Sequence, residues 1–305
     1  MLSDSGQIIC VGGILWETSF HVDEIPGRGV KLLPRDAQQI ASGMAVSAAA
    51  SIAKLGGAAE LWGLLGDDSN GQACLRNLSD DGIAVAQLEI VPGGRTPFST
   101  VLIDPAGERL VVPYFDPALF AAPVRLPLAR IAQARAVLAD VRWVEGAEAA
   151  LRHAQECGVP AILDADLAPR AVLECLMKLA DHVLFSEVAL LSLFDGLRPH
   201  AALLAMAEQL PQAEVIGVTL GAEGSLLWER ARPGDIHHTP SPNIRAVDTL
   251  NAGDVWHGAY AYGLSVGMSA TDRVRFANVA AAIKCERPGG RLGAPTLPDV
   301  LARLR

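Results

Sequence analysis

The sequence predicts an α/β fold, a doubly wound and mainly parallel β-sheet flanked by helices. Short runs of β-branched and aliphatic residues alternate with longer alanine-rich segments, which is the pattern of successive β-α-β units. The chain has 305 residues, of which 50% are hydrophobic, so it is long enough to bury a sizeable core without disulfides or metals.

The predicted elements follow one another along the whole chain. The expected strands are short apolar runs, at 8–11, 60–65, 136–139, 161–164, 182–185, 215–219 and 225–228. The expected helices are longer and rich in alanine, at 45–55, 71–81, 147–157, 188–194, 200–210, 254–266 and 271–285. Several strands end at polar or glycine-rich residues, and ligands of open parallel sheets gather at such carboxyl ends.

Two segments interrupt the alternation, at 17–41 and 87–117. The second contains a predicted hairpin with strands at 97–104 and 109–114 around a Pro-Ala-Gly turn. We expect these segments to form a small β-sheet that serves as a lid over the site, inserted in a single domain that spans 1–305.

Charge and composition exclude several classes of function. The net charge of −9 argues against nonspecific binding to nucleic acid or to an anionic membrane surface. No apolar stretch approaches the roughly 20 residues of a membrane span. The segment Met1 to Gln7 carries no basic residue and does not resemble a secretory leader, so a cytoplasmic location is expected. The five cysteines form no CxxC pair, which supports neither a disulfide framework nor a zinc site.

The segment 248–254, Asp-Thr-Leu-Asn-Ala-Gly-Asp, precedes a predicted helix. A helix N-terminus gathers unpaired N–H groups and favours anions such as phosphate. Asp254 there is expected to stay ionised and to accept a proton from an attacking hydroxyl, while the amides of Asn251, Ala252 and Gly253 stabilise the transferred group. Taken alone, such a segment is more often a simple helix cap.

Short motifs that extend over nearly the whole chain, in a fixed order, support the same interpretation. They are Gly12-Gly13, Ser42-Gly43, Lys54-Leu55-Gly56, 64–68, Gly71, 218–224, 248–254 and 276–282. With these motifs the chain resembles the PfkB or ribokinase family of carbohydrate kinases. The resemblance implies a ribokinase-like fold, ATP as phosphoryl donor, Asp254 as catalytic base and the amides of residues 251–253 as an anion hole.

The resemblance also implies where the nucleotide and metal ions bind. The ATP-binding positions are Ser186, Thr219, Gly221, Gly224 and Asn278. Ala189 stands where the family has a glutamate that organises Mg²⁺, which leaves Glu187 as the only nearby carboxylate, so Mg²⁺ would be held mainly by ATP and water.

Three further residues match a region that binds a monovalent cation, such as K⁺, in many members. They are Asp248, Thr249 and Gly289. A carboxylate and backbone carbonyls suit a hard cation, but a glycine-rich turn without any ion fits the same residues.

Within the family, the chain most resembles the bacterial sulfofructose kinases, through the runs 137–143, 163–166 and 284–291 and the pair Ser186-Glu187. This resemblance implies that Lys31 and Arg142 contact an anionic end of the substrate. An arginine fork suits a tetrahedral oxyanion because it donates two parallel hydrogen bonds.

The implied sugar pocket comprises Glu17, Ser42, Gly43 and Ser47 beside Asp254. Glu17 replaces an aspartate of the family, Ser42 a glycine, and Ser47 an asparagine that many members carry. Asn251 stands where the family has glycine, and asparagine tolerates left-handed backbone geometry better than most residues. We therefore expect a substrate that differs from the commonest sugars of the family.

The leading hypothesis is an ATP-dependent kinase for a ketose-like, anionic sugar, acting as a homodimer through the lid strands. A different class of function is a non-catalytic nucleotide- or sugar-binding protein, which Asn251 and Ala189 keep open. A third reading is a kinase for a nucleoside or a phosphosugar, which depends on whether Lys31 and Arg142 both face the pocket.

Overall fold

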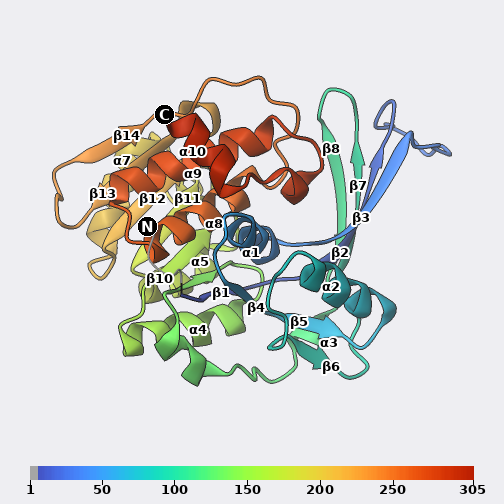
Figure 1. Ribbon diagram of the computed structural model, residues 1–305, viewed down its shortest axis with the longest axis horizontal. Coiled ribbons are helices and arrows are strands. Elements are labelled where there is room, and N and C mark those ends of the chain that lie inside the picture. The colour runs from blue at the N-terminus through green and yellow to red at the C-terminus, as the bar shows by residue number, and fades with distance from the viewer. Residues whose placement is uncertain (1–5) are drawn as a thin grey trace.

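The computed structural model describes residues 6–305, so most of the segment Met1 to Gln7 considered above lies outside the described residues. Figure 1 shows a central sheet with helices on both faces and a second sheet at one side. The central sheet has eight strands in the order β14-β13-β12-β11-β10-β9-β1-β4. They are β1 Ile8–Val11, β4 Ala59–Trp62, β9 Ala136–Ala139, β10 Ala161–Ala165, β11 His182–Ser186, β12 Val215–Thr219, β13 Ser225–Glu229 and β14 Ile236–Thr239.

Six neighbouring strands, from β4 to β12, pair in parallel, and β13 and β14 complete the sheet in antiparallel orientation. This arrangement confirms the predicted α/β class. Because the parallel strands share one direction, their carboxyl ends lie at the same edge of the sheet. The last residues of β1, β9, β10, β11 and β12 at this edge are Val11, Ala139, Ala165, Ser186 and Thr219.

Alternate residues of the strands pack into two hydrophobic cores, one on each face of the sheet. In β1, Ile8 and Cys10 pack on one side, while Ile9 and Val11 pack on the other. The first core includes α1 Met44–Lys54, α8 Ala252–Ser265 and α9 Ala270–Cys285. The remaining helices are α2 Ser69–Asp80, α3 Pro117–Phe120, α4 Val144–Cys157, α5 Arg170–Leu176, α6 Glu187–Leu191, α7 Pro199–Gln209 and α10 Leu297–Leu304.

Two predicted elements differ from the structure. The expected strand 60–65 is divided at Gly63, where a Cβ atom would lie 2.8 Å from the Gly12 carbonyl oxygen. The chain leaves β1 there, and β5 Leu64–Gly66 pairs with β6 Glu89–Val91 in a sheet of two strands. The expected helix 188–194 begins at Glu187 and ends at Leu191, and the amides of Leu193 and Phe194 bond three residues back in tighter turns.

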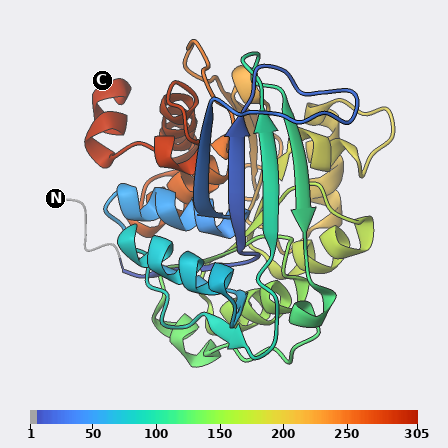
Figure 2. The same cartoon turned by 90° about the vertical axis from the view of Figure 1, so that its right-hand side faces the viewer.

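A separate four-stranded sheet, here called the side sheet, stands beside the central one. Its order is β3-β2-β7-β8, with β2 Leu15–His21, β3 Asp36–Ser42, β7 Phe98–Ile103 and β8 Arg109–Tyr114. The two strands around the Pro-Ala-Gly turn thus form the expected hairpin. Figure 2 shows the side sheet across one side of the molecule.

The strand register sorts the side chains of the side sheet into two faces. Glu17, Ser19 and His21 share the face of Ser99 and Arg109, because paired residues point the same way. The opposite, outer face is mostly apolar, with Trp16, Phe20, Phe98, Leu102, Leu110, Val112 and Tyr114.

Within residues 6–305, the model contains no helix with the length and apolar character that crossing a membrane requires.

Candidate active site

Helix α8 begins at the predicted catalytic segment. Asn251 caps it with φ of 61° and ψ of 15°, and it is the one residue other than glycine with positive φ among residues 6–305. The expected left-handed conformation of Asn251 is therefore observed. Its Nδ2 donates a hydrogen bond of 2.8 Å to Oδ2 of Asp254. The side chain at this position thus contacts the carboxylate predicted to be the base.

The first turn of α8 borders open space. A Cβ atom on Gly253 would meet no atom within 4 Å. The Ala252 amide makes only a long bond, 3.3 Å, to the Thr249 carbonyl. Amides of a first helical turn have no partner within the helix, so this end offers hydrogen-bond donors to an anion.

The pKa of Asp254 differs from the expectation. Burial, followed by the nearby Asp164, raises the pKa of Asp254 to about 7, although the Asn251 amide and His257 act in the opposite direction. The helix N-terminus was expected to keep this carboxyl group ionised, but the pKa of Asp254 lies above the ordinary value of an aspartate. Loss of solvent around the carboxylate outweighs the helix dipole here.

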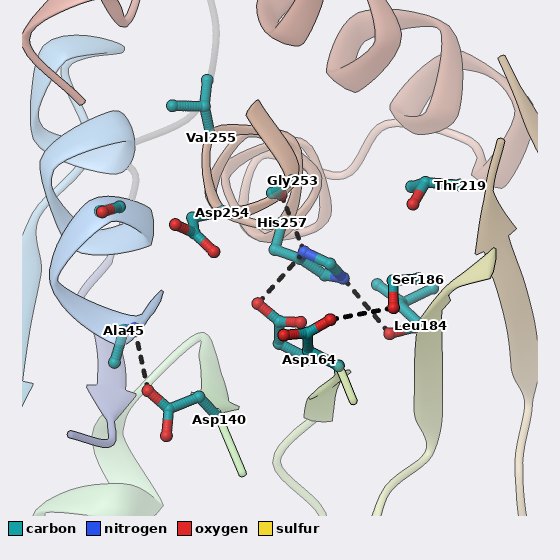
Figure 3. Close-up of polar contacts among 12 residues, drawn as sticks. Ala45, Asp140, Asp164, Leu184, Ser186, Thr219, Gly253, Asp254, Val255 and His257 are labelled. Carbon is teal, nitrogen blue, oxygen red and sulfur yellow. Dashed lines mark hydrogen bonds and ion pairs between the residues drawn. The ribbon is translucent and has the colours of Figure 1, made fainter. Parts of the chain in front are cut away.

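His257 and Asp164, which were not predicted as site residues, are neighbours of Asp254. Figure 3 shows His257 reaching Asp164 from α8, the helix that also carries Asp254. Nδ1 of His257 lies 3.2 Å from Oδ2 of Asp164 and 2.8 Å from the Gly253 carbonyl oxygen. Nε2 lies 3.3 Å from the Leu184 carbonyl oxygen. The helical spacing between residues 254 and 257 was the available signal, since residues three apart share a helix face.

Asp140, at the carboxyl end of β9, is a third buried carboxyl group of this region. It accepts hydrogen bonds from the amides of Arg142 at 2.8 Å and Ala45 at 3.1 Å. Burial raises the pKa of Asp140 to about 6. A Cβ atom on Gly12 would lie 2.1 Å from its carboxylate, so the predicted Gly12-Gly13 pair makes room for Asp140.

A first cavity of about 350 Å³ lies between the side sheet and the loop that precedes α8. Among the predicted sugar-binding residues, Glu17 and Ser42 line it, and burial raises the pKa of Glu17. Gly43, Ser47 and Asp254 are not among the lining residues, and the Ser47 hydroxyl donates to the Gly43 carbonyl at 2.8 Å. Other lining side chains include Ser19, His21, Gln38, Arg109, Asp248, Asn251 and Arg291.

The two predicted anion-binding residues do not line this cavity. Arg142 bonds to Asp166 at 2.8 Å and to the Leu167 carbonyl oxygen at 3.0 Å. Lys31 is exposed in the loop that joins β2 to β3. Arg109, which was not predicted, is the arginine that the side sheet presents to the cavity.

A second cavity of about 440 Å³ contains most of the predicted ATP-binding positions. Thr219, Gly221, Gly224 and Asn278 line it. Asn278 is buried, and its amide oxygen accepts from Ser225 at 2.6 Å and from Trp256 at 2.7 Å, while its nitrogen donates to the Thr239 carbonyl at 2.9 Å. Its side chain therefore shapes the cavity wall through these contacts.

The remaining predicted nucleotide position, Ser186, and the predicted magnesium position, Glu187, lie at the end of β11. The Ser186 hydroxyl donates to Asp166 at 2.9 Å, and Glu187 is exposed in the first turn of α6. Among residues 6–305, no group of three or more His, Cys, Asp or Glu side chains is arranged to hold a metal ion.

The loop before α8 separates the two cavities. Asp248 and Asn251 line the first, Ala252 and Gly253 line the second, and Thr249 lines both. Gly289 also lines the first cavity, beside Asp248 and Thr249. A phosphoryl group that passes from one cavity to the other would meet the N-terminus of α8, where Asp254 lies.

The chain is similar to known carbohydrate kinases in sequence. The family model of pfkB family carbohydrate kinases matches residues 5–297. An ATP-dependent ribose-1-phosphate kinase from Halopiger xanaduensis is 28% identical over 304 residues, which cover 98% of each chain. A fructokinase from Escherichia coli is 30% identical over 272 residues, 82% of each chain.

Solved structures share the fold. A provisionally named ribokinase from Agrobacterium tumefaciens has 41% sequence identity and a TM-score of 0.95, over 98% of this chain and 97% of that one. Arabidopsis thaliana ribokinase complexed with ribose and ATP has a TM-score of 0.84 at 22% identity, over 98% and 99% of the two chains. The protein therefore belongs to the pfkB family and is a carbohydrate kinase.

Proposed function

We propose that this kinase transfers the γ-phosphoryl group of ATP to a hydroxyl group of a small, ketose-like sugar with an anionic end. The observation that carries the proposal is the position of the 248–253 loop between the two cavities, with Asp254 in the first turn of α8. The sugar lies in the first cavity, the nucleotide in the second, and the side sheet covers the sugar as a lid.

The reaction uses few protein groups. Asp254 accepts the proton of the sugar hydroxyl as its oxygen bonds to the γ-phosphorus, and the bond from that phosphorus to the β,γ-bridging oxygen breaks, which leaves ADP and a sugar phosphate. The amides of Ala252 and Gly253 stabilise charge on the transferred group. The nucleotide and water, with Glu187 as the predicted protein carboxylate, would hold Mg²⁺, which would supply positive charge to the phosphates.

Arg109 supports an anionic substrate. It lies on the inner face of the side sheet and lines the first cavity. A guanidinium group there suits a phosphate or a sulfonate, since both present tetrahedral oxyanions. The relative from Halopiger xanaduensis is named for a phosphosugar. Sulfofructose, like a phosphosugar, carries an anionic group.

The direct test is phosphorylation of a sugar panel by the wild type and by Asp254→Asn. The panel contains fructose, ribose, sulfofructose, ribose 1-phosphate and a nucleoside. We expect ATP consumption with an anionic sugar and a loss of kcat of about a hundredfold or more in Asp254→Asn, because the amide cannot accept the proton. Nucleotide binding, measured by calorimetry, should persist in the variant.

Two outcomes would contradict the proposal. Full activity in Asp254→Asn would exclude this residue as the base. Tight binding of ATP and sugar with no phosphotransfer to any panel member would instead favour a non-catalytic binding protein. A matched variant, Asp195→Asn, alters an exposed aspartate away from both cavities and should retain the wild-type rate.

We also propose that the protein is a cytoplasmic homodimer that joins two side sheets. The outer face of the side sheet exposes several large apolar residues, among them Phe98, Leu110, Val112 and Tyr114. Apolar surface on an uncovered sheet favours association, and two-fold dimers are the commonest homo-oligomers.

A further inference from the structure

Lys284 places a positive charge inside the predicted monovalent-cation site. This residue lies in the last turn of α9, and its side chain is fully buried. Its Nζ donates a hydrogen bond of 2.6 Å to the main-chain oxygen of Asp248 and lies 3.1 Å from Oδ2 of the same residue. Burial of an ammonium group requires such partners, because water no longer solvates the charge.

The other acceptor positions of Asp248 are also occupied. Oδ1 accepts from the Leu250 amide at 2.8 Å, and Oδ2 accepts from the Gly290 amide at 2.8 Å. A hard cation requires several free oxygen ligands at short range. The carbonyl and the carboxylate that would supply them are committed to an ammonium group and two amides, and an added ion would repel the ammonium. The residues present therefore do not fit a bound K⁺ ion.

The contacts of Asp248 join three segments. The Cys285 carbonyl, next to Lys284, accepts the amides of Val247 at 2.7 Å and Asp248 at 3.1 Å. The carboxylate of Asp248 bonds to the turn that leads to Asn251, the cap of α8, and to the 289–290 turn, where Gly289 and Gly290 both have positive φ. The orientation of the first turn of α8, and of Asp254 on it, thus depends on Asp248.

We propose that the ammonium group of Lys284 takes the place of a monovalent cation and holds the loop before α8 in its active geometry, so that the kinase works without K⁺. Lys284 is a positioning residue, since it acts through Asp248 and touches neither the sugar nor the phosphates. The proposal rests on the proposed phosphotransfer, but its consequences for ion binding do not.

The test compares KCl with tetramethylammonium chloride, each at about 0.1 M so that screening of exposed charges is equal. The variants are Lys284→Met, which keeps the length of the side chain, and a matched control, Lys54→Met. Lys54 also donates to two carbonyl oxygens, those of Leu292 and Ala294, but outside the loop before α8. The wild type should show equal rates, within about twofold, and equal melting temperatures in both salts.

Lys284→Met should lower kcat by about tenfold or more and leave the KM for ATP nearly unchanged, because the loop that orients the base is loosened. K⁺ should then fill the vacated position, restore part of the rate and raise the melting temperature by about 2 °C or more relative to tetramethylammonium. Lys54→Met should show no such preference for K⁺.

Three results would overturn the proposal. The first is a wild-type rate, or a melting temperature, that falls sharply when K⁺ is withdrawn, which needs no variant. The second is a Lys284→Met kinase as fast as Lys54→Met. The third is a melting temperature of Lys284→Met that does not respond to K⁺. The melting experiments require no sugar substrate, so they distinguish failure of this inference from failure of the proposed phosphotransfer.

Discussion

Asp254 lies beside two other buried carboxyl groups, Asp164 and Asp140, and both raise its pKa. The base therefore needs a pH above its pKa of about 7 to be mostly ionised in the free enzyme. Since only the ionised form accepts a proton, kcat/KM should fall about tenfold for each pH unit below that value. A profile of kcat/KM between pH 5 and pH 9 measures this fall, which is the acidic limb of the profile.

Asp164→Asn provides the variant for this pH profile. The substitution removes the carboxyl group that contributes most to the pKa of Asp254 after burial itself. The acidic limb should therefore move to lower pH, by about one unit. Asp195→Asn should leave the limb in place, and an unchanged limb in Asp164→Asn would disprove the coupling between the two carboxyl groups.

At the scale of elements, Arg291 connects the side sheet to the helical layer. Its buried guanidinium donates to the Ala41 carbonyl of β3 at 2.8 Å, to Asp81 at 2.6 Å and to Asn77 of α2 at 2.7 Å. Arg291→Met removes all three bonds and the charged partner of Asp81. We expect the free energy of unfolding to fall by about 2–4 kcal/mol, measured by urea denaturation.

Arg287→Met is the control for this loss of a charge. Arg287 pairs with Asp299 at 3.2 Å, and both side chains are more than a third exposed. Exposed pairs contribute about 1 kcal/mol or less, so this variant should remain close to the wild type in stability. Equal losses in the two variants would mean that Arg291 does not have the connecting role described here.

At the scale of the molecule, the apolar outer face of the side sheet predicts a dimer. Val112, in β8, is 56% exposed, and Val112→Glu places a charge in the middle of the proposed contact. We expect sedimentation velocity to show a dimer for the wild type and a monomer for the variant, since burying an unpaired carboxylate is costly.

Val124→Glu, at a position that is 37% exposed and lies outside the side sheet, should remain dimeric. A monomeric wild type at micromolar concentration would exclude the dimer. A dimer that persists in Val112→Glu would place the contact elsewhere on the surface.

The sequence alone predicted most of the elements and the class of the fold. Strand and helix periodicity is local, so short apolar runs such as Ile8–Val11 and Val215–Thr219 were located at the residues observed. Motifs that require a particular backbone conformation were also located from the sequence. Asn251 occupies the left-handed conformation that only glycine and a few polar residues accept readily.

Side-chain partners could not be read in the same way. The sequence suggested Arg142 and Lys31 for an anionic substrate, but Arg142 pairs with Asp166, and it is Arg109 that lines the cavity. It also suggested a bound cation beside Asp248. It did not show that the ammonium group of Lys284 donates to the main-chain oxygen of Asp248. These contacts join residues far apart in the chain, and they depend on how strands and helices pack.

The sequence by itself thus determined the α/β class, the helix start at segment 248–254 and the glycine-rich turns, because each depends on local backbone preferences. The tertiary structure decided the protonation of Asp254, through burial beside Asp164, and the contacts made by Lys284 and Arg109. Desolvation of a side chain and contacts between distant residues arise only when distant segments pack together. Local sequence patterns therefore do not predict them.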